Sequence, residues 1–180
     1  MQTYYLIRHC EATGQAADAP LTPQGQKQAL LLADFFKSIP VDRILSSPFR
    51  RAIESINAVA VQAGCSIEID DDLRERTLSS QSLTDWQGEL RRTFIEFDYA
   101  CPGGETSAEA TQRIQGVMND VWSHSAETTI LVTHGNLLTL YLHSLDSSFG
   151  FEQGQHLRNP DIFLVKKVNG AFIFENLNLF

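Results

Sequence analysis

The chain has 180 residues, of which 43% are hydrophobic and 20% are charged, and its formal net charge is −8 at pH 7. This length and apolar content are sufficient for one hydrophobic core, so we expect a single domain that spans residues 1–180. Nucleic acids and anionic membranes attract basic surfaces. The acidic balance therefore argues against both as partners.

The cysteines and the N-terminal segment indicate a cellular location. Cys10, Cys65 and Cys101 are too few and too scattered to form a disulfide framework or a zinc cluster, which favours a reducing compartment. The first residues run directly into an apolar stretch without a signal-peptide pattern, and no apolar run is long enough to span a bilayer. We expect a soluble, unprocessed, cytoplasmic protein.

The N-terminal part of the chain predicts a strand followed by a helix. Residues 4–8 are mostly apolar and predict the strand. Thr22 is suited to cap a helix and Pro23 to occupy its first turn. Apolar residues then recur at helical spacing as far as Phe36, so one stripe of this helix is expected to lie against a sheet.

The alternation of strands and helices continues through the next segment. Residues 41–46 predict a second strand, and Ser47 with Pro48 predicts the cap and first turn of a helix that extends to about residue 63. Residues 66–70 alternate with period two and predict a third strand.

The segment after the third strand is acidic and poorly periodic. Residues 71–76 are expected to form a loop, and a metal site at the acidic run is not expected because consecutive residues point in different directions. Capping-box patterns at Ser82 and Thr106 each predict the start of a helix. Residues 128–133 predict a strand that leads to a further short helix.

The C-terminal part carries the signal of a β-hairpin, because Asn169 and Gly170 separate the apolar stretches 162–168 and 171–175. Strands that alternate with helices imply parallel strands with right-handed crossovers. We therefore predict an α/β fold, a three-layer α/β/α sandwich with a mainly parallel central sheet and a C-terminal antiparallel hairpin.

Residues capable of chemistry follow the predicted strands. In parallel sheets, ligands bind outside the carboxyl ends of the strands. Six side chains lie at or shortly after such ends: Arg8, His9, Ser47, Arg51, Glu75 and His134. Their convergence on one edge of the sheet predicts a site there.

A pocket that gathers Arg8, His9, Arg51 and His134, with Glu75 on its rim, fits a phosphoryl group. Arginine donates paired hydrogen bonds to phosphate and stays charged. A neutral imidazole can attack phosphorus while the other groups stabilise the equatorial oxygens. A carboxylic acid with a raised pKa can protonate the leaving group, and Glu75 is the candidate. This chemistry requires neither a metal ion nor another cofactor.

Short motifs occur in one order along nearly the whole chain. They are Arg8-His9-Cys10, Pro20-Leu21-Thr22 with Gly25 and Gln28-Ala29, residues 46–52, Leu73-Arg74-Glu75, Pro102-Gly103-Gly104-Glu105 and Val132-Thr133-His134-Gly135. In these motifs the chain resembles the histidine phosphatase superfamily, the phosphoglycerate-mutase-like proteins, whose hallmark is an Arg-His-Gly triplet after the first strand. Several ordered matches with compatible secondary structure are far more specific than any one of them.

The resemblance implies roles for individual residues. His9 is implied as the nucleophile and Glu75 as the proton donor. The implied phosphate pocket consists of three residues: Arg8, Arg51 and His134. Arg51 is preferred to Arg50 because the arginine of the family directly precedes a small residue, here Ala52.

Two positions depart from the family pattern. Cys10 replaces the usual glycine, and Ala12 stands where the family usually has Thr or Ser. Glycine lets backbone approach a ligand closely, so Cys10 is expected to alter the pocket or to fill a small space. These departures motivate the alternative of a non-catalytic phosphate-binding or regulatory module.

The function predicted from sequence is a metal-independent phosphomonoesterase that acts on a small phosphorylated substrate through a phosphohistidine intermediate on His9. The nearest alternative is a phosphoglycerate-type mutase that uses the same residues. Such mutases carry longer insertions and a tail over the site, whereas this chain is short between Glu75 and Pro102 and ends soon after its hairpin. The phosphatase is therefore favoured.

The substrate and the oligomeric state are left open by the sequence. Specificity is expected to depend on loops at residues 15–19 and 78–99. Aromatic residues near the second loop either line a specificity pocket or belong to the core: Trp86, Phe94, Phe97 and Tyr99. Arg50, Arg74 and Arg76 are expected on solvated faces, although one of them could contact the distal part of the substrate.

Overall fold

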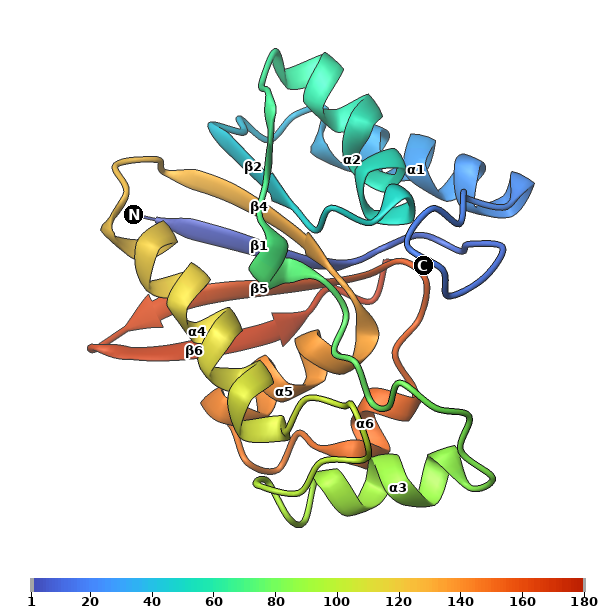
Figure 1. Cartoon of the computed structure of the whole chain (residues 1–180). Helices are drawn as coiled ribbons and strands as arrows, with labels where there is room; N and C mark the ends of the chain where they lie inside the picture. Colours follow the sequence, from blue (N-terminus) through green and yellow to red (C-terminus); the bar gives the residue numbers. More distant parts are fainter. Residues whose placement is uncertain (1, 180) are drawn as a thin grey trace.

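The computed structural model describes residues 2–179, and its centre is one mixed sheet (Figure 1). The strands are β1 (Thr3–Arg8), β2 (Arg43–Ser46), β3 (Ile67–Ile69), β4 (Thr128–Thr133), β5 (Asp161–Val168) and β6 (Ala171–Asn176). Their order across the sheet is β3-β2-β4-β1-β5-β6. The four strands from β3 to β1 are parallel, and β5 joins β1 in antiparallel orientation.

The predicted C-terminal hairpin is present as β5 and β6, which are antiparallel neighbours. Asn169 and Gly170 form its turn, with φ angles of 51° and 85°. Positive φ at both central positions is the geometry that makes Asn-Gly favourable in two-residue hairpin turns. The hairpin therefore adds two strands beside β1 and leaves β6 at the edge.

Helices cover both faces of the sheet (Figure 1). Their bounds are α1 (Pro23–Phe36), α2 (Arg50–Ala63), α3 (Trp86–Thr93), α4 (Ser107–Ser123), α5 (Gly135–Leu145) and α6 (Phe151–Gln155), with a short 3₁₀ helix η1 at Asp71–Leu73. Helices α1 and α2 lie on one face, and α4 and α5 on the other. This arrangement is the predicted three-layer α/β/α sandwich.

The two faces of β1 each belong to a separate hydrophobic cluster. Tyr5 and Ile7 pack with the apolar residues of α1 and α2. Tyr4 and Leu6 pack with those of α4 and α5. Because successive side chains of a strand point to opposite faces, an all-apolar strand is what a sheet covered on both sides requires. Among residues 2–179, no helix is long and apolar enough to cross a membrane.

The start of α2 differs from the prediction. The helix begins at Arg50, and the N-cap position is Phe49, which makes no side-chain capping bond. Ser47 lies two residues before this N-cap position: its backbone N–H donates to the carbonyl of Val132 at 3.0 Å and so extends the β2–β4 ladder. Its hydroxyl accepts from the backbone N–H of Phe49 at 3.2 Å, just ahead of the helix.

Three further segments differ from the sequence-based expectation. Helix α3 begins at Trp86, because the carboxylate of Asp85 accepts from the Gly88 N–H and caps the helix later than Ser82 would. The expected loop at 71–76 contains η1, which Asp70 caps through the N–H of Asp72. Helix α6 was not predicted, since five residues are too few for a periodic pattern.

The parallel register brings the ends of three strands together. Arg8 at the end of β1 is paired with Thr133 of β4, and Ser46 of β2 is paired with Val132. The residues that follow these strands therefore lie at the same edge of the sheet, where the sequence predicts the site.

Candidate active site

Arg8 lies at the end of β1, half-buried, with its side chain against the start of α5. Its Nη1 donates to the carbonyl of Leu157 at 2.5 Å. Gly135 permits this packing, because a Cβ there would lie 3.1 Å from the Arg8 Nε. Within the described chain, that Nε is buried without a hydrogen-bond partner. Burial lowers the pKa of Arg8, although Glu75 and Asp161 oppose the shift.

His9 is held in one tautomer by its neighbour. Its Nδ1 lies 2.7 Å from the carbonyl oxygen of Cys10. Because a carbonyl only accepts, Nδ1 carries the proton and Nε2 retains its lone pair. The Arg51 Nε–H donates to this Nε2 at 3.2 Å.

The electrostatic surroundings keep His9 neutral. Its side chain is buried, and burial lowers its pKa to about 4; the positive charges of Arg51 and Arg8 act in the same direction, against the bond to Cys10. At neutral pH the imidazole is therefore uncharged, with a lone pair directed at an arginine. This is the state in which histidine is a nucleophile.

Arg51 and Arg50 have opposite environments at the start of α2. Arg51 is 1% exposed and donates through Nη1 to the carbonyls of Gln15 at 3.2 Å and Ala16 at 2.8 Å. Arg50 is exposed and pairs with Glu54 at 2.6 Å. The structure thus places Arg51, and not Arg50, beside His9.

His134 follows β4 and occupies the N-cap position of α5. It is fully buried, and its ring centroid lies 5.0 Å from that of His9. Its Nε2 lies 2.7 Å from the Ser47 Oγ, whereas its Nδ1 has no partner within residues 2–179. Burial lowers the pKa of His134 well below its ordinary value, and the charge that His9 carries when protonated and the charges of Arg51 and Arg8 act in the same direction.

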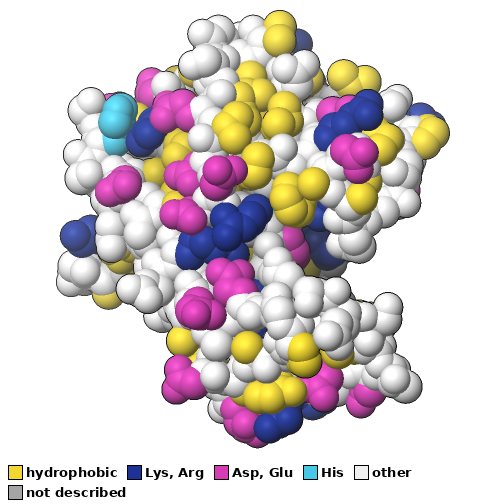
Figure 2. Space-filling model, viewed as in Figure 1, with side chains coloured by type: hydrophobic (Ala, Val, Ile, Leu, Met, Phe, Trp, Pro, Cys, Tyr) yellow, Lys and Arg dark blue, Asp and Glu magenta, His cyan; other side chains and the backbone are white. Residues whose placement is uncertain are grey.

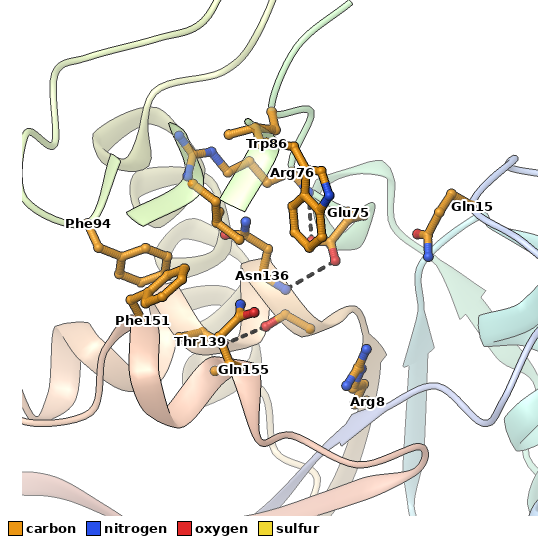
Figure 3. Close-up of a pocket in the computed structure, with 14 residues that line it drawn as sticks. Arg8, Gln15, Glu75, Arg76, Trp86, Phe94, Asn136, Thr139, Phe151 and Gln155 are labelled. Atoms are coloured by element: carbon orange, nitrogen blue, oxygen red, sulfur yellow. Dashed lines mark hydrogen bonds between the residues drawn. The ribbon is translucent and has the colours of Figure 1, made fainter. Parts of the chain in front are cut away.

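Glu75 approaches the same turn from the segment after η1. Its carboxylate accepts from the backbone N–H of Asn136 at 3.1 Å (Figure 3) and from that of Leu137 at 3.0 Å. These N–H groups belong to the first turn of α5, where donors have no partner within the helix. Glu75 is thus fixed next to His134 by a helix N-terminus.

A cavity of about 510 Å³ is lined by Arg8 and Glu75 of this group, whereas the buried His9, Arg51 and His134 are not among its lining residues. Its lining residues are Arg8, Gln15, Glu75, Arg76, Leu78, Trp86, Leu90, Phe94, Gly135, Asn136, Thr139, Phe151, Gly154 and Gln155. In the space-filling view, the surface is indented between the lower part that carries α3 and the rest of the molecule (Figure 2). The volume is in the range of small-molecule sites.

The wall far from Arg8 is largely aromatic. Trp86 and Phe94 line the cavity as the pocket hypothesis proposed, and Phe151 of the unpredicted α6 joins them (Figure 3). Phe97 instead stacks near His143 with centroids 5.2 Å apart, and the Tyr99 hydroxyl donates to Glu89. The pocket hypothesis is therefore right for two of its four aromatic residues.

Arg76 contradicts the expectation of a solvated face, since it is only 4% exposed and lines the cavity. Its Nη1 donates to the Thr93 Oγ1 at 2.8 Å and its Nε to the Glu105 carbonyl at 3.0 Å. These partners are distant in sequence, so no local pattern could have indicated the burial. Arg50 and Arg74 are exposed as expected.

Ser47 is the other residue whose role sequence analysis misjudged. It was interpreted as a helix cap, yet its hydroxyl contacts His134 across 87 positions of the chain. Asn136, Thr139 and Gln155 also line the cavity without having been singled out. The position of Asn136 directly after the His134-Gly135 motif is the signal that could have found it.

Cys10 packs as a small apolar residue. It is fully buried in the cluster of α1 and α2, and its backbone N–H donates to the Ser55 Oγ at 2.8 Å. Burial raises the pKa of its thiol to about 11, so a reactive thiolate is disfavoured. Outside glycine, positive φ angles in the described chain occur at Asn169 and Asn178, so Cys10 adopts a conformation open to any L-residue.

Solved structures with the same fold include both phosphatases and a mutase. "Mycobacterial hydrolase 1" has a TM-score of 0.80 at 19% identity and covers 97% of this chain and 96% of its own. A mycobacterial glucosyl-3-phosphoglycerate phosphatase has a TM-score of 0.78 at 19% identity, with coverage of 98% and 97%. A phosphoglycerate mutase from Bacillus anthracis str. Sterne has 0.78 at 20%, with coverage of 98% and 92%.

Sequence comparison identifies the family. A probable phosphoglycerate mutase from Enterobacter sp. (strain 638) is 30% identical over 151 residues, which cover 75% of this chain and 70% of that protein. The family model of the histidine phosphatase superfamily (branch 1) matches residues 4–178. The chain belongs to the histidine phosphatase superfamily.

Proposed function

We propose that this protein is a phosphomonoesterase that transfers the phosphoryl group of a small substrate to His9 and then to water. One observation carries the proposal: the neutral Nε2 of His9 accepts from Arg51, the His134 ring lies beside it, and the adjacent Arg8 lines the cavity together with Glu75. Neither Arg8 nor Arg51 forms an ion pair in the described part of the chain. Their charges are available to an anion.

In the first half-reaction, the His9 Nε2 attacks phosphorus and the ester P–O bond breaks. A phosphoryl oxygen takes the Nε–H of Arg51 that His9 accepts in the free protein, and this exchange releases the lone pair. Arg8, whose buried Nε has no partner in residues 2–179, supplies a second donor. Fixed donors around the equatorial oxygens stabilise charge in the transition state.

Glu75 completes the proton balance. In its protonated form it gives its proton to the leaving alkoxide, and it later takes a proton from the water that attacks phosphorus and breaks the P–N bond. Its two bonds from the N-terminus of α5 hold the carboxyl group in one orientation at the cavity wall. Glu75 would thus serve both half-reactions from one position.

The second candidate is a phosphoglycerate-type mutase, and the 30% identity to a probable phosphoglycerate mutase favours it. The same residues would return the phosphoryl group to a substrate hydroxyl. We prefer hydrolysis because the cavity opens to the surface beside α3, where water can enter (Figure 2). A non-catalytic phosphate-binding module is less favoured, because Cys10 leaves the geometry of His9 intact.

The experiment that tests the proposal is hydrolysis of phenyl phosphate with a chelator present, combined with a search for phosphohistidine. We expect turnover that survives chelation, and ³¹P NMR of quenched protein that shows an acid-labile phosphoramidate. His9→Ala is expected to lose both signals, and His124→Ala, an exposed histidine, to retain them. Absence of turnover and of phosphoenzyme in the wild type would contradict the proposal.

The mutase is distinguished in the same assay with phosphoglycerate. If the 2- and 3-phospho isomers interconvert faster than phosphate is released, the function is that of a mutase and not of a hydrolase. Tight phosphate binding without turnover of any ester would leave the binding module as the best account.

A further inference from the structure

Arg76 is a buried cation that the proposed chemistry does not use. It immediately follows Glu75 and lines the same cavity, and in Figure 3 Glu75 and Asn136 lie between it and Arg8. Two of its nitrogens are engaged by Thr93 and by the Glu105 carbonyl. Its Nη2 is buried and has no hydrogen-bond partner anywhere in residues 2–179. Arg76 thus lines the cavity and carries one buried N–H donor that has no partner within the described protein.

The charge of Arg76 also lacks a dedicated carboxylate. The nearest candidate, Glu105, gives both its oxygens to Arg113, at 2.8 Å each. Across the part of the chain that the structure describes, Arg76 forms no ion pair. Burial lowers the pKa of Arg76, and the charges of Glu105 and Glu75 oppose this without a direct ion pair. A buried guanidinium without a directly bonded anion is costly.

The surface between Arg76 and the open side of the cavity is apolar. Trp86, Leu90 and Phe94 contribute one part of it, and Phe151 lies against Phe94 with ring centroids 6.2 Å apart. Trp86 is 52% exposed, so it presents an indole face that a ligand can cover. Such a wall favours a flat, apolar body over a polyol, because burial of apolar area provides the gain.

From the unpaired Arg76 donor and the apolar wall beside it, we propose the substrate class: a phosphate monoester whose leaving group is a flat, apolar, preferably aromatic body that bears a carboxylate. The phosphoryl group occupies the Arg8 and Arg51 end, the ring lies against Trp86 and Phe94, and the carboxylate accepts from Arg76. This inference rests on the proposed function for its catalytic readout. It predicts poor use of a small polar carboxylate such as phosphoglycerate.

The first test compares four esters on the wild-type protein: phenyl phosphate, 3- and 4-carboxyphenyl phosphate, and the 4-carboxamide of the same ring. The carboxamide has the shape of the carboxylate without its charge. We expect kcat/KM for at least one carboxyphenyl ester to exceed that for the carboxamide by about tenfold to a hundredfold, the range for a hydrogen bond to a charged group. Equal values for the carboxylates and the carboxamide would overturn the role of Arg76.

Variants of Arg76 test whether this residue causes the preference for the carboxylate over the carboxamide. Arg76→Gln removes the charge, and we expect the carboxylate-to-carboxamide ratio to fall to near one; Arg76→Lys retains the charge and is expected to keep part of the ratio. Arg74→Gln, an exposed arginine two positions away, is the matched control and should keep the wild-type ratio. Since Arg76 also holds Thr93 and Glu105, a variant that fails to fold leaves the wild-type ratio as the deciding result.

Binding separates this inference from the proposed function. Calorimetry on His9→Ala, which is expected to bind esters without turnover, should show tighter binding of the carboxyphenyl ester than of the carboxamide. If no ester is hydrolysed by the wild type but this binding order holds, the hydrolytic function fails and the ligand class stands. If 3-phosphoglycerate binds more tightly than the carboxyphenyl esters, the aromatic part of the class is wrong.

Discussion

The two ends of the cavity are built differently. At the phosphoryl end, Arg8 and Glu75 line the cavity; the adjoining His9, Arg51 and His134 follow neighbouring parallel strands or begin helices, and each is at least nine-tenths buried. At the distal end, Trp86 and Phe151 come from short helices outside the three layers, and Trp86 is half exposed. The first end is fixed by the sheet, whereas the second depends on a local segment.

This difference assigns separate tasks to the two ends. Phosphoryl transfer requires donors that are already in place, because reorganisation during the reaction raises the barrier. Recognition of a leaving group tolerates side chains that adjust, and loops carried by a rigid scaffold commonly perform it. Substitutions at the sheet end should therefore change kcat, and those at the distal end should change KM.

The largest expected effect concerns Glu75. Glu75→Gln keeps an acceptor oxygen for one of the two N–H groups of α5, loses the acceptor for the other, and removes the transferable proton. We expect kcat for an alkyl phosphate, a poor leaving group, to fall about 10²–10⁴-fold, and kcat for 4-nitrophenyl phosphate to fall much less. Steady-state kinetics across a leaving-group series measures this. Equal losses for all esters would show that Glu75 is not the proton donor.

A variant of Ser47 tests whether the hydrogen bond between Ser47 and His134 positions the histidine for catalysis. Ser47→Ala removes the hydroxyl 2.7 Å from the His134 Nε2. We expect a loss of about 1–3 kcal/mol in the free energy of unfolding and about a tenfold fall in kcat. Ser46→Ala is the matched control, because its buried hydroxyl donates to the Ser47 carbonyl and does not touch the histidine. Equal falls in kcat for both variants would contradict positioning.

The pH dependence of stability tests the buried, neutral state of His9. Its pKa of about 4 in the folded protein lies below the ordinary value of 6.5, so the unfolded chain binds more protons between these values. The free energy of unfolding should therefore fall as pH drops below 6.5, by about 2 kcal/mol at pH 5 from this residue alone, and this contribution is constant above 6.5.

Urea unfolding at pH 7 and pH 5 measures this difference, and an NMR titration of the His9 ring reports its pKa directly. His9→Ala should lose the corresponding part of the pH dependence. An unchanged dependence in that variant, or a ring that titrates near 6.5, would show that His9 is not buried as described.

The smallest expected effect lies at the distal end. Trp86→Ala should raise KM for aryl phosphates about threefold to tenfold through lost apolar contact, with little change in melting temperature because the ring is half exposed. Ile95→Ala removes a residue of the same segment that is 77% exposed and lies outside the cavity lining, so it should leave KM unchanged. A fall in kcat for Trp86→Ala without a change in KM would contradict the separate roles of the two ends of the cavity.

Local sequence patterns were enough to predict the alternation of strands and helices, the Asn169-Gly170 hairpin and the convergence of five residues on one edge of the sheet: Arg8, His9, Arg51, Glu75 and His134. Periodicity and turn chemistry are local properties, and parallel strands place their carboxyl ends together whatever the details of packing. The roles of these residues in catalysis stay predictions that the experiments above address.

The side-chain contacts between segments that are distant in sequence depend on how the whole chain packs. Ser47 reads locally as a helix cap, and its bond to His134 appears only when β2 and β4 pair. The local sequence predicts Arg76 on the surface, but the structure buries it, and its hydrogen-bond partners Thr93 and Glu105 are distant in sequence. Helix α6 is too short to leave a periodic signal, yet it supplies Phe151 to the cavity. Contacts between segments far apart in the chain carry no local pattern, and the distal wall consists of such contacts.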